Sequence, residues 1–249
     1  MMSSALEGKI ALVTGGSRGI GAAIAKHLAR DGANVAITYT SAKDKADEVV
    51  KEMEAIGRRA IAIRADNLAA EAMDLAVNET IAKLGGLDIL VNNAGILHTG
   101  PIEDFTLEDF EQTIAINVRA PFLACRAAGR QMRAGGRIIS IGSNLADRAP
   151  RPGLSLYSMS KAALVGMSKA LARELGQKGI TVNVVQPGST DTEMNPADGA
   201  FADNQRARMA LPGRFATPED IAGLVSWLAG PGAASVTGSV YTIDRGSNA

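Results

Sequence analysis

Short apolar runs alternate with longer segments of helical periodicity along most of the 249 residues. The runs are five or six residues long and rich in Val, Ile and Ala, which is typical of strands buried on both faces of a sheet. They predict strands at residues 9–14, 34–38, 60–64, 88–92, 137–141, 181–185 and 240–244. Apolar positions three or four residues apart predict helices at residues 19–32, 43–57, about 68–83, about 155–176 and about 218–229.

This alternation predicts parallel strands, because a helix between two strands returns the chain to the same edge of the sheet. The expected fold is a single-domain Rossmann fold of the α/β class. It is a doubly wound parallel sheet of about seven strands with helices on both faces. No linker, low-complexity tract or repeat divides the sequence, so we expect one domain over residues 1–249.

The composition argues against several classes of function. Lys and Arg together number 26, as do Asp and Glu, and this balance does not favour nucleic acid or a membrane as a partner. No stretch approaches the roughly 18 apolar residues of a membrane span. Cys125 is the only cysteine, and the two histidines, His27 and His98, are isolated, so we expect no disulfide and no metal site. Without a charged-then-apolar leader, the expected location is cytoplasmic.

A glycine-rich turn joins the first predicted strand to the first predicted helix. It reads TGGSRGIG over residues 14–21, with Gly15, Gly19 and Gly21 in a spacing that differs from the common G-x-G-x-x-G. Glycines let the backbone approach a pyrophosphate closely, and free N–H groups at the helix start favour an anion. The turn lacks the G-K-[ST] ending of an NTPase phosphate loop. A dinucleotide site is therefore predicted, with a ligand-free tight turn as the alternative.

The end of the second predicted strand favours NADP(H) over NAD(H). A site that prefers NAD often has an acid here, on the ribose hydroxyls. This chain reads TYTSAK at residues 38–43, with no carboxylate before Asp44. Arg18 and Lys43 would accept a 2′-phosphate, although both could be ordinary solvated charges.

Polar or turn residues follow the remaining strands as well. They are Asp66 and Asn67, NNAG at residues 92–95, SIGSN at residues 140–144 and QPGSTDT at residues 186–192. Ligands of open parallel sheets bind beyond the carboxyl ends of the strands, so these residues predict a site. Asp66 could accept a bond from an adenine amino group, or it could cap the next helix.

Tyr157 and Lys161 are four residues apart in a predicted helix, which places both on one face about a turn apart. Such a pair on its own is more often a surface tyrosine beside a solvated lysine. With Asn117 in IAINVRAPF, Ser143 and the motifs above, however, the chain resembles the short-chain dehydrogenase/reductase family over nearly its whole length. It looks most like bacterial enzymes similar to 3-oxoacyl-[acyl-carrier-protein] reductases and related ketoreductases.

The resemblance implies an NADP(H)-dependent reduction of a ketone or 3-oxoacyl carbonyl to a secondary alcohol. Tyr157 would be the general acid, Lys161 would lower its pKa and bond the nicotinamide ribose, and Ser143 would hold the carbonyl oxygen. Asn117 would anchor a water chain to the lysine. Cofactor contacts are expected at Gly15, Ser17, Arg18, Gly19, Ile20, Gly21, Tyr39, Thr40, Ser41, Asp66, Asn67, Asn93, Ala94, Gly95, Tyr157, Lys161, Pro187, Gly188, Thr190 and Thr192.

The segment at about residues 188–214 has no clear strand and is long for a connection, so we predict a substrate lid there. Substrate contacts are expected at His98, Asn144, Leu145, Leu154 and Met194, although His98 is more simply a loop residue without a role. Arg126, Arg130, Arg133 and Arg173 could dock an acyl carrier or could be solvated helix faces. The small residues Ala162, Gly166 and Ala170 predict a subunit interface, as in the homotetramers of the family, or else packing on the chain's own sheet.

The chain departs from the family pattern in several features, among them Asn67, which follows Asp66 where valine is frequent. Ser143 and Tyr157 are 14 residues apart, one more than is commonest, and Arg245 stands in the tail where glycine is expected. A nucleotide-binding regulatory protein with little turnover is the main alternative function, and an epimerase or lyase on the same scaffold is another.

Overall fold

Seven parallel strands form one sheet in the computed structural model, which describes residues 4–249. Their order is β3-β2-β1-β4-β5-β6-β7, so the winding reverses between β1 and β4. The strands are β1 (Ile10–Val13), β2 (Asn34–Tyr39), β3 (Ala60–Arg64), β4 (Ile89–Asn92), β5 (Arg137–Ile141), β6 (Thr181–Pro187) and β7 (Val240–Ile243). This confirms the predicted doubly wound sheet, with β3 and β5 at the predicted bounds.

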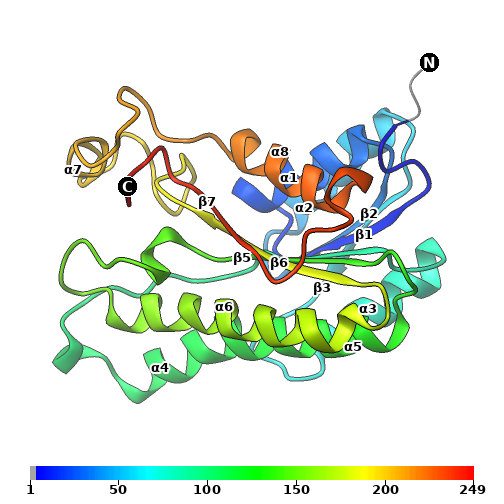
Figure 1. Cartoon of the computed structure of the whole chain (residues 1–249), viewed down its shortest axis with the longest axis horizontal. Coiled ribbons are helices and arrows are strands. Elements are labelled where there is room, and N and C mark those ends of the chain that lie inside the picture. The colour runs from blue at the N-terminus through cyan, green and yellow to red at the C-terminus, as the bar shows by residue number, and fades with distance from the viewer. Residues whose placement is uncertain (1–3) are drawn as a thin grey trace.

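Helices cover both faces of the sheet (Figure 1). One layer consists of α1 (Gly19–Arg30), α2 (Lys43–Ala55) and α8 (Pro218–Ala229). The opposite layer consists of α3 (Ala72–Leu84), α5 (Ala120–Gln131) and α6 (Ser155–Gly176). Alternate residues of each strand pack into these layers: Val13 of β1 belongs to the first core and its neighbour Leu12 to the second.

The remaining helical elements are shorter. They are α4 (Leu107–Ile114), α7 (Ala202–Arg206), a π-helical turn at Ala115–Arg119, and 3-10 turns at Ile102–Asp104, Asn144–Ala146 and Pro231–Ala233. None of the helices predicted from the sequence covers the region of α4 and α5. The helix predicted from about residue 68 begins later, at Ala72, because Asp66 and Asn67 start a separate turn.

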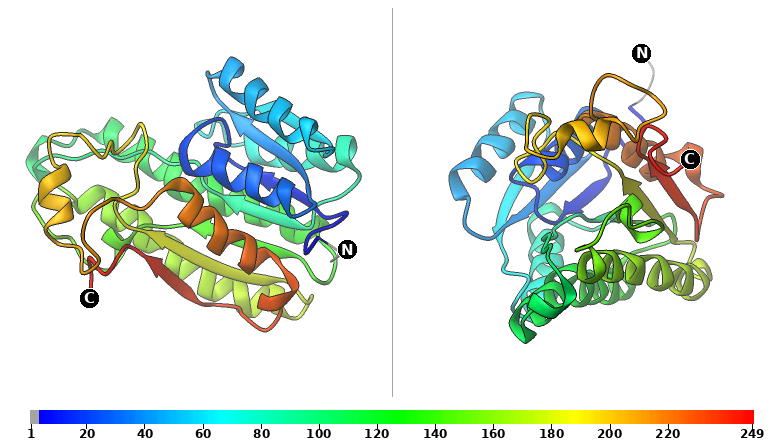
Figure 2. Two further views of the ribbon diagram at one scale, coloured as in Figure 1. Left: turned by 90° about the horizontal axis from the view of Figure 1, so that it is seen from above. Right: turned by 90° about the vertical axis from the view of Figure 1, so that its left-hand side faces the viewer.

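Three loops meet at the carboxyl edge of the sheet. The amide of Gly100, after β4, donates a 3.1 Å hydrogen bond to the carbonyl of Gly153, before α6. The guanidinium of Arg151 lies 5.4 Å from the centre of the Phe201 ring, in the segment after β6. In the left view of Figure 2, that segment and its helix α7 lie near the C-terminus of the chain. The loops that we expect to hold the substrate are therefore in contact.

Candidate functional site

The glycine-rich turn is closed by the end of β2. The amide of Gly15 donates to the Thr38 hydroxyl at 3.0 Å, and the amide of Gly16 donates to the Thr38 carbonyl at 2.9 Å. Gly15 and Gly19 have φ of 63° and 54°, in the left-handed region. A Cβ atom at Gly21 would lie only 2.3 Å from the Gly15 carbonyl oxygen. Three glycines of the motif are thus required by the backbone itself.

The N-terminus of α1 is free to hold an anion. Arg18, the N-cap residue, provides no side-chain acceptor to the first turn, and that turn contains no acidic residue. A Cβ atom at Gly19 would lie 3.5 Å from the Thr192 methyl group, so the start of the segment after β6 lies against this turn. Unpaired helix N–H groups beside a side-chain-free backbone fit the pyrophosphate of a dinucleotide.

Arg18 and Lys45 share one carboxylate beside this turn. Glu193 accepts from the Arg18 guanidinium at 2.9 Å and from the Lys45 ammonium at 2.5 Å, and these bonds lower the pKa of Glu193. The groove that they line, together with Lys26 and Glu52, has a volume of about 330 Å³. Lys43, in contrast, pairs with Asp47 on its own helix. Lys45, which the sequence analysis did not single out, is therefore the lysine that shares a partner with Arg18.

The NNAG segment is tied to β1 by Thr14. The Thr14 hydroxyl accepts from the amides of Asn93 and Ala94 at 3.0 and 3.1 Å. The Asn93 side chain donates to the carbonyls of Thr14 and Gly15 at 3.0 and 3.1 Å. A Cβ atom at Gly15 would lie 3.1 Å from that of Ala94, so the two segments are in close contact. These contacts join the ends of β1 and β4 at the point where the strand order reverses. Ligand crevices of open parallel sheets lie at such a point.

The strand-end residues expected at the adenine side lie together at the ends of β2 and β3. Thr40 donates to the Ala65 carbonyl at 3.4 Å, and Tyr39 ends β2 with Ser41 two residues beyond. Asp66 accepts from the Leu68 amide at 3.0 Å, which is a local turn bond rather than a helix cap. Asn67 is buried.

Tyr157 and Lys161 lie on one face of α6, as their spacing predicts. The Lys161 ammonium nitrogen is 5.8 Å from the centre of the Tyr157 ring and donates to the Ile141 carbonyl at 2.9 Å. Lys161 is 4% exposed, so it is not a solvated surface lysine. Ser143, which is also buried, interacts with the Tyr157 hydroxyl and thereby lowers the pKa of that group. The ends of β5 and α6 thus bring a hydroxyl, a phenol and an ammonium together.

The prediction that Lys161 lowers the pKa of Tyr157 is wrong for the chain's own residues. Burial raises the pKa of Tyr157 to about 12, against the smaller effect of Ser143. Burial also lowers the pKa of Lys161 to about 8. Desolvation disfavours the charged forms of both groups, and the Lys161 nitrogen is hydrogen-bonded to the Ile141 carbonyl.

Asn117 lies in the π-helical turn between α4 and α5. Its side-chain oxygen accepts from the Ile96 amide at 2.9 Å, and its amide group donates to the Ile96 carbonyl at 2.9 Å and the Ser160 hydroxyl at 3.0 Å. A Cβ atom at Gly95 would lie 3.2 Å from this oxygen and 3.3 Å from the Lys161 nitrogen. Asn117 and Lys161 therefore face the same small space beside Gly95. Single-turn π-bulges are frequent at functional sites.

The residues expected to contact substrate differ in how they are held. Asn144 donates to Asp244 at 3.2 Å, and Leu154 is buried at the start of α6. Leu145 is partly exposed, and Met194 is 55% exposed. His98 is not a free loop residue, because its ring nitrogen lies 3.4 Å from the Thr113 hydroxyl and 3.6 Å from an Asp109 oxygen.

The residues after β6 form a closely bonded turn. A Cβ atom at Gly188, which follows Pro187, would lie 2.4 Å from that of Asp244, so only glycine fits. The Thr190 hydroxyl donates to the Gly188 carbonyl at 3.1 Å, and the Thr192 hydroxyl accepts from the Asn195 amide at 3.2 Å. Thr192 also lies against Gly19 of the glycine-rich segment at residues 14–21, which contains Ser17 and Ile20 as well.

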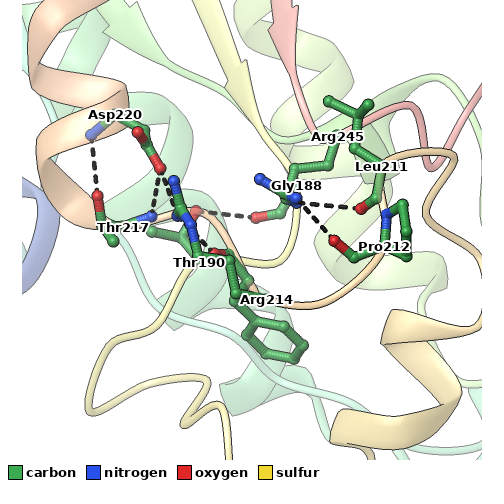
Figure 3. Close-up of polar contacts among 9 residues, drawn as sticks. Gly188, Thr190, Leu211, Pro212, Arg214, Thr217, Asp220 and Arg245 are labelled. Atoms are coloured by element: carbon green, nitrogen blue, oxygen red, sulfur yellow. Dashed lines mark hydrogen bonds and ion pairs between the residues drawn. The ribbon is translucent and has the colours of Figure 1, made fainter.

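The segment from Ser189 to Phe215 carries its own small core and hydrogen bonds. Met209, Phe215 and Ala202 form a separate apolar cluster. Gln205 and Asn195 exchange two side-chain hydrogen bonds of 3.0 and 2.9 Å. At its far end, Arg214 pairs with Asp220 of α8 at 2.8 Å (Figure 3).

Several residues that build the site were missed by sequence reasoning. They are Thr14, Thr38, Lys45, Ser160, Glu193 and Asp244. Thr14 and Thr38 lie in the strand-end segments at residues 14–21 and 38–43, but no contact was predicted for their own side chains. The remaining contacts join segments far apart in the sequence and leave no local signal.

No helix among residues 4–249 has the length and apolarity needed to cross a membrane. Within the same residues, no three His, Cys, Asp or Glu side chains are grouped so as to hold a metal ion. Cys125 is buried, and burial raises the pKa of its thiol to about 12, which agrees with a packing role.

Comparison with known proteins gives matches over nearly the whole chain. The model of a family described as enoyl-(acyl carrier protein) reductase matches residues 15–248. A short-chain dehydrogenase from Burkholderia cenocepacia J2315, whose crystal structure is a complex with NADP, is 56% identical with a TM-score of 0.97. This similarity covers 98% of this chain and 100% of the other.

Two curated relatives are similar over comparable lengths. The cyclic-di-GMP-binding biofilm dispersal mediator protein of Escherichia coli (strain K12) is 46% identical over 96% of this chain and 97% of its own. A hydroxynaphthalene reductase of Aspergillus fumigatus is 40% identical over 95% of this chain and 91% of its own.

Proposed function

This chain belongs to the short-chain dehydrogenase/reductase family and is an NAD(P)-dependent oxidoreductase, and we propose that it uses NADP(H) to reduce a ketone or 3-oxoacyl carbonyl to a secondary alcohol. The observation that supports this most is the cluster of Ser143, Tyr157, Lys161 and Asn117, in which only Tyr157 is partly exposed and Asn117 and Lys161 lie beside Gly95. A protein that only bound a nucleotide would have no need of all four groups together.

The chain's own residues supply everything except the hydride. The bound cofactor would supply a hydride to the carbonyl carbon. Tyr157 keeps its phenol proton at neutral pH because burial raises its pKa to about 12, and it would deliver this phenol proton to the carbonyl oxygen. Ser143 would donate a hydrogen bond to the same oxygen and stabilise its developing negative charge. The Lys161 ammonium, which faces the same space beside Gly95 as the Asn117 oxygen, would return a proton to Tyr157. Lys161 would regain its proton from solvent through a water chain anchored by Asn117.

The cofactor preference is proposed from two positively charged side chains at the glycine turn. Arg18 and Lys45 lie where a carboxylate already binds both, so an added phosphate would find two cations there. The end of β2 carries the hydroxyls of Tyr39, Thr40 and Ser41 and no acid. The similar structure from Burkholderia cenocepacia, which contains NADP, supports the same preference.

The substrate is proposed to be partly apolar. Exposed apolar side chains lie on the loops at the carboxyl edge of the sheet, among them Ile102, Met194, Phe201 and Leu211. An acyl thioester would suit such a surface. A carrier-docking role for the arginine patch has less support at Arg126, because this side chain pairs with Asp74 at 2.5 Å, whereas Arg130, Arg133 and Arg173 are exposed.

A homo-oligomer, with the family's tetramer as the expectation, is proposed from one face of α6. Ala162, Gly166 and Ala170 are all exposed, and a Cβ atom at Gly166 would meet nothing within 4 Å. The alternative reading, that these small residues pack on the chain's own sheet, is therefore wrong. We propose a cytoplasmic location, consistent with a balanced charge and a single buried cysteine.

The test is a screen of NADPH and NADH oxidation with small ketones, quinones, a 3-oxoacyl thioester and an enoyl thioester. NADPH consumption with a ketone or 3-oxoacyl thioester is expected. No consumption with any carbonyl compound, or consumption only with the enoyl thioester, would contradict the proposed reaction.

A nucleotide-binding regulatory protein with little turnover is the second candidate. It is favoured by one observation, the 46% identity to a protein described as binding cyclic di-GMP. Calorimetric titration with cyclic di-GMP, alone and with saturating NADPH, separates the two. Tight cyclic di-GMP binding with no turnover in the screen would favour this candidate.

A further inference from the structure

Arg245 has a backbone conformation that side-chain-bearing residues rarely adopt. Its φ is 57°, and among residues 4–249 no other residue except glycine has a positive φ. The left-handed region is unfavourable for a residue with a Cβ atom, and such strain persists where the surroundings determine it and often where it serves function. The side chain of Arg245 should therefore make contacts that glycine could not.

Those contacts are with the far end of the segment that we expect to be the substrate lid. The guanidinium donates from Nε to the Leu211 carbonyl at 3.2 Å and from Nη2 to the Pro212 carbonyl at 3.0 Å (Figure 3). The Arg245 carbonyl accepts from the Leu211 amide at 3.0 Å. A Cβ atom at Gly246 would lie 2.7 Å from that of Ala210, so the next residue of the tail also lies against this segment.

The same tail is anchored beside the candidate catalytic serine. Asp244 is buried and accepts from the Asn144 side chain at 3.2 Å and from the Asn248 amide at 3.0 Å. The Asn248 side chain donates to the Asn144 carbonyl at 2.7 Å. Asn144 directly follows Ser143, so residues 244–248 connect the turn of Ser143 to the end of the lid within one chain.

We propose that Arg245 is a positioning residue that fixes the lid end at Leu211 and Pro212 relative to the Ser143 turn, and so sets how tightly the substrate carbonyl is held. This rests on the proposed function, because the lid matters only if a substrate binds beneath it. The guanidinium holds two backbone carbonyls at once, which neither a glycine nor a lysine in its place would do. The two bonds offset the backbone strain at Arg245.

The test compares Arg245→Gly with Arg245→Ala. The glycine variant removes both the strain and the side-chain bonds, so its melting temperature should be equal to or higher than that of the parent protein. The alanine variant keeps the strain and loses the bonds, so its melting temperature should fall by several degrees. In both variants, hydrogen exchange of lid residues 207–214 should become at least 5-fold faster.

The kinetic expectation is a split between KM and kcat. With a 3-oxobutanoyl thioester, the KM of Arg245→Gly should rise about 5- to 10-fold, with kcat within about 2-fold and the dissociation constant of NADPH unchanged. Arg208→Ala is the matched control, because Arg208 is an exposed lid arginine for which the structure gives no side-chain bond. It should behave as the parent protein in every assay.

Unchanged lid exchange in Arg245→Gly would overturn the proposal, as would faster exchange with an unchanged KM. Lid exchange is measured without substrate, so the positional effect can be judged even if the parent protein reduces no carbonyl compound. In that case the proposed function fails, whereas the link between Arg245 and the lid is still decided by the exchange data.

Discussion

The ammonium nitrogen of Lys161 lies 5.8 Å from the centre of the Tyr157 ring while it donates a 2.9 Å hydrogen bond to the Ile141 carbonyl. Both side chains come from α6, and Ile141 ends β5, so the helix and the sheet together fix the ammonium beside the phenol. Burial lowers the pKa of Lys161 to about 8 and raises that of Tyr157 to about 12. The phenol therefore carries its proton at neutral pH, which is the form that a proton donor needs.

Replacing Lys161 by methionine should stabilise the fold while it removes activity. The folded protein holds the lysine at a pKa of about 8 against 10.5 in the unfolded chain, so below pH 8 a buried charge destabilises the native state. Lys161→Met removes that charge but leaves the Ile141 carbonyl without its donor. The net gain in unfolding free energy at pH 7 should be about 1–2 kcal/mol.

The stability gain of Lys161→Met should shrink as the pH rises. The unfolded chain binds more protons than the folded one between pH 8 and 10.5, so the parent protein gains stability relative to Lys161→Met across that range. Urea unfolding at pH 7 and pH 9.5 measures the difference. A gain that does not shrink toward pH 9.5, or a variant less stable at both values, would show that the buried ammonium is not the destabilising group.

Adding one methyl group at Gly95 should disturb the catalytic cluster without unfolding the chain. The new Cβ atom would lie 3.2 Å from the Asn117 oxygen and 3.3 Å from the Lys161 nitrogen, so both must move by a few tenths of an ångström. Gly95→Ala should lower kcat roughly 10-fold or more. Gly86→Ala is the control, because its Cβ atom would lie at an ordinary 3.5 Å from the Ile10 methyl group. Equal kcat values in the two variants would refute the assigned roles of Asn117 and Lys161.

Removing the positive charge of Arg18 should weaken the cofactor preference. In Arg18→Met, the dissociation constant of NADPH should rise roughly 10-fold while that of NADH changes little, since only NADPH carries the 2′-phosphate. Arg30→Met, at the other end of the same helix, is the control. Fluorescence titration of both cofactors measures the effect. An equal loss for NADH and NADPH would place Arg18 at the pyrophosphate rather than at the 2′-phosphate.

The fold could be predicted because its strands leave a local signal. Ala60–Arg64 is an unbroken apolar run up to its terminal arginine, and Arg137–Ile141 is apolar except at Arg137 and Ser140. Both strands have the predicted bounds. The helices α4 and α5 were harder to predict from the sequence, because a π-helical turn interrupts the helical periodicity at Ala115–Arg119. At the site, the spacing of Tyr157 and Lys161 correctly placed them on one helical face.

The direction of the Tyr157 pKa could not be predicted in the same way. It depends on how strongly the fold desolvates the phenol and on the smaller opposing effect of Ser143, which comes from another segment of the chain. The pairing of Glu193 with both Arg18 and Lys45 depends likewise on the path of the lid, which no local pattern records. Contacts between distant loops are the part of the site that required the structure.

The most direct test of the central claim is the single-turnover rate of NADPH oxidation by Tyr157→Phe with the best carbonyl substrate of the screen. Phenylalanine keeps the ring and removes the proton, so the rate should fall about 10³-fold while the dissociation constant of NADPH stays within about 3-fold. Tyr241→Phe, on β7, controls for the loss of a hydroxyl elsewhere and should react as the parent protein does. A Tyr157→Phe rate within 10-fold of the parent rate would contradict the assignment of Tyr157 as the proton donor.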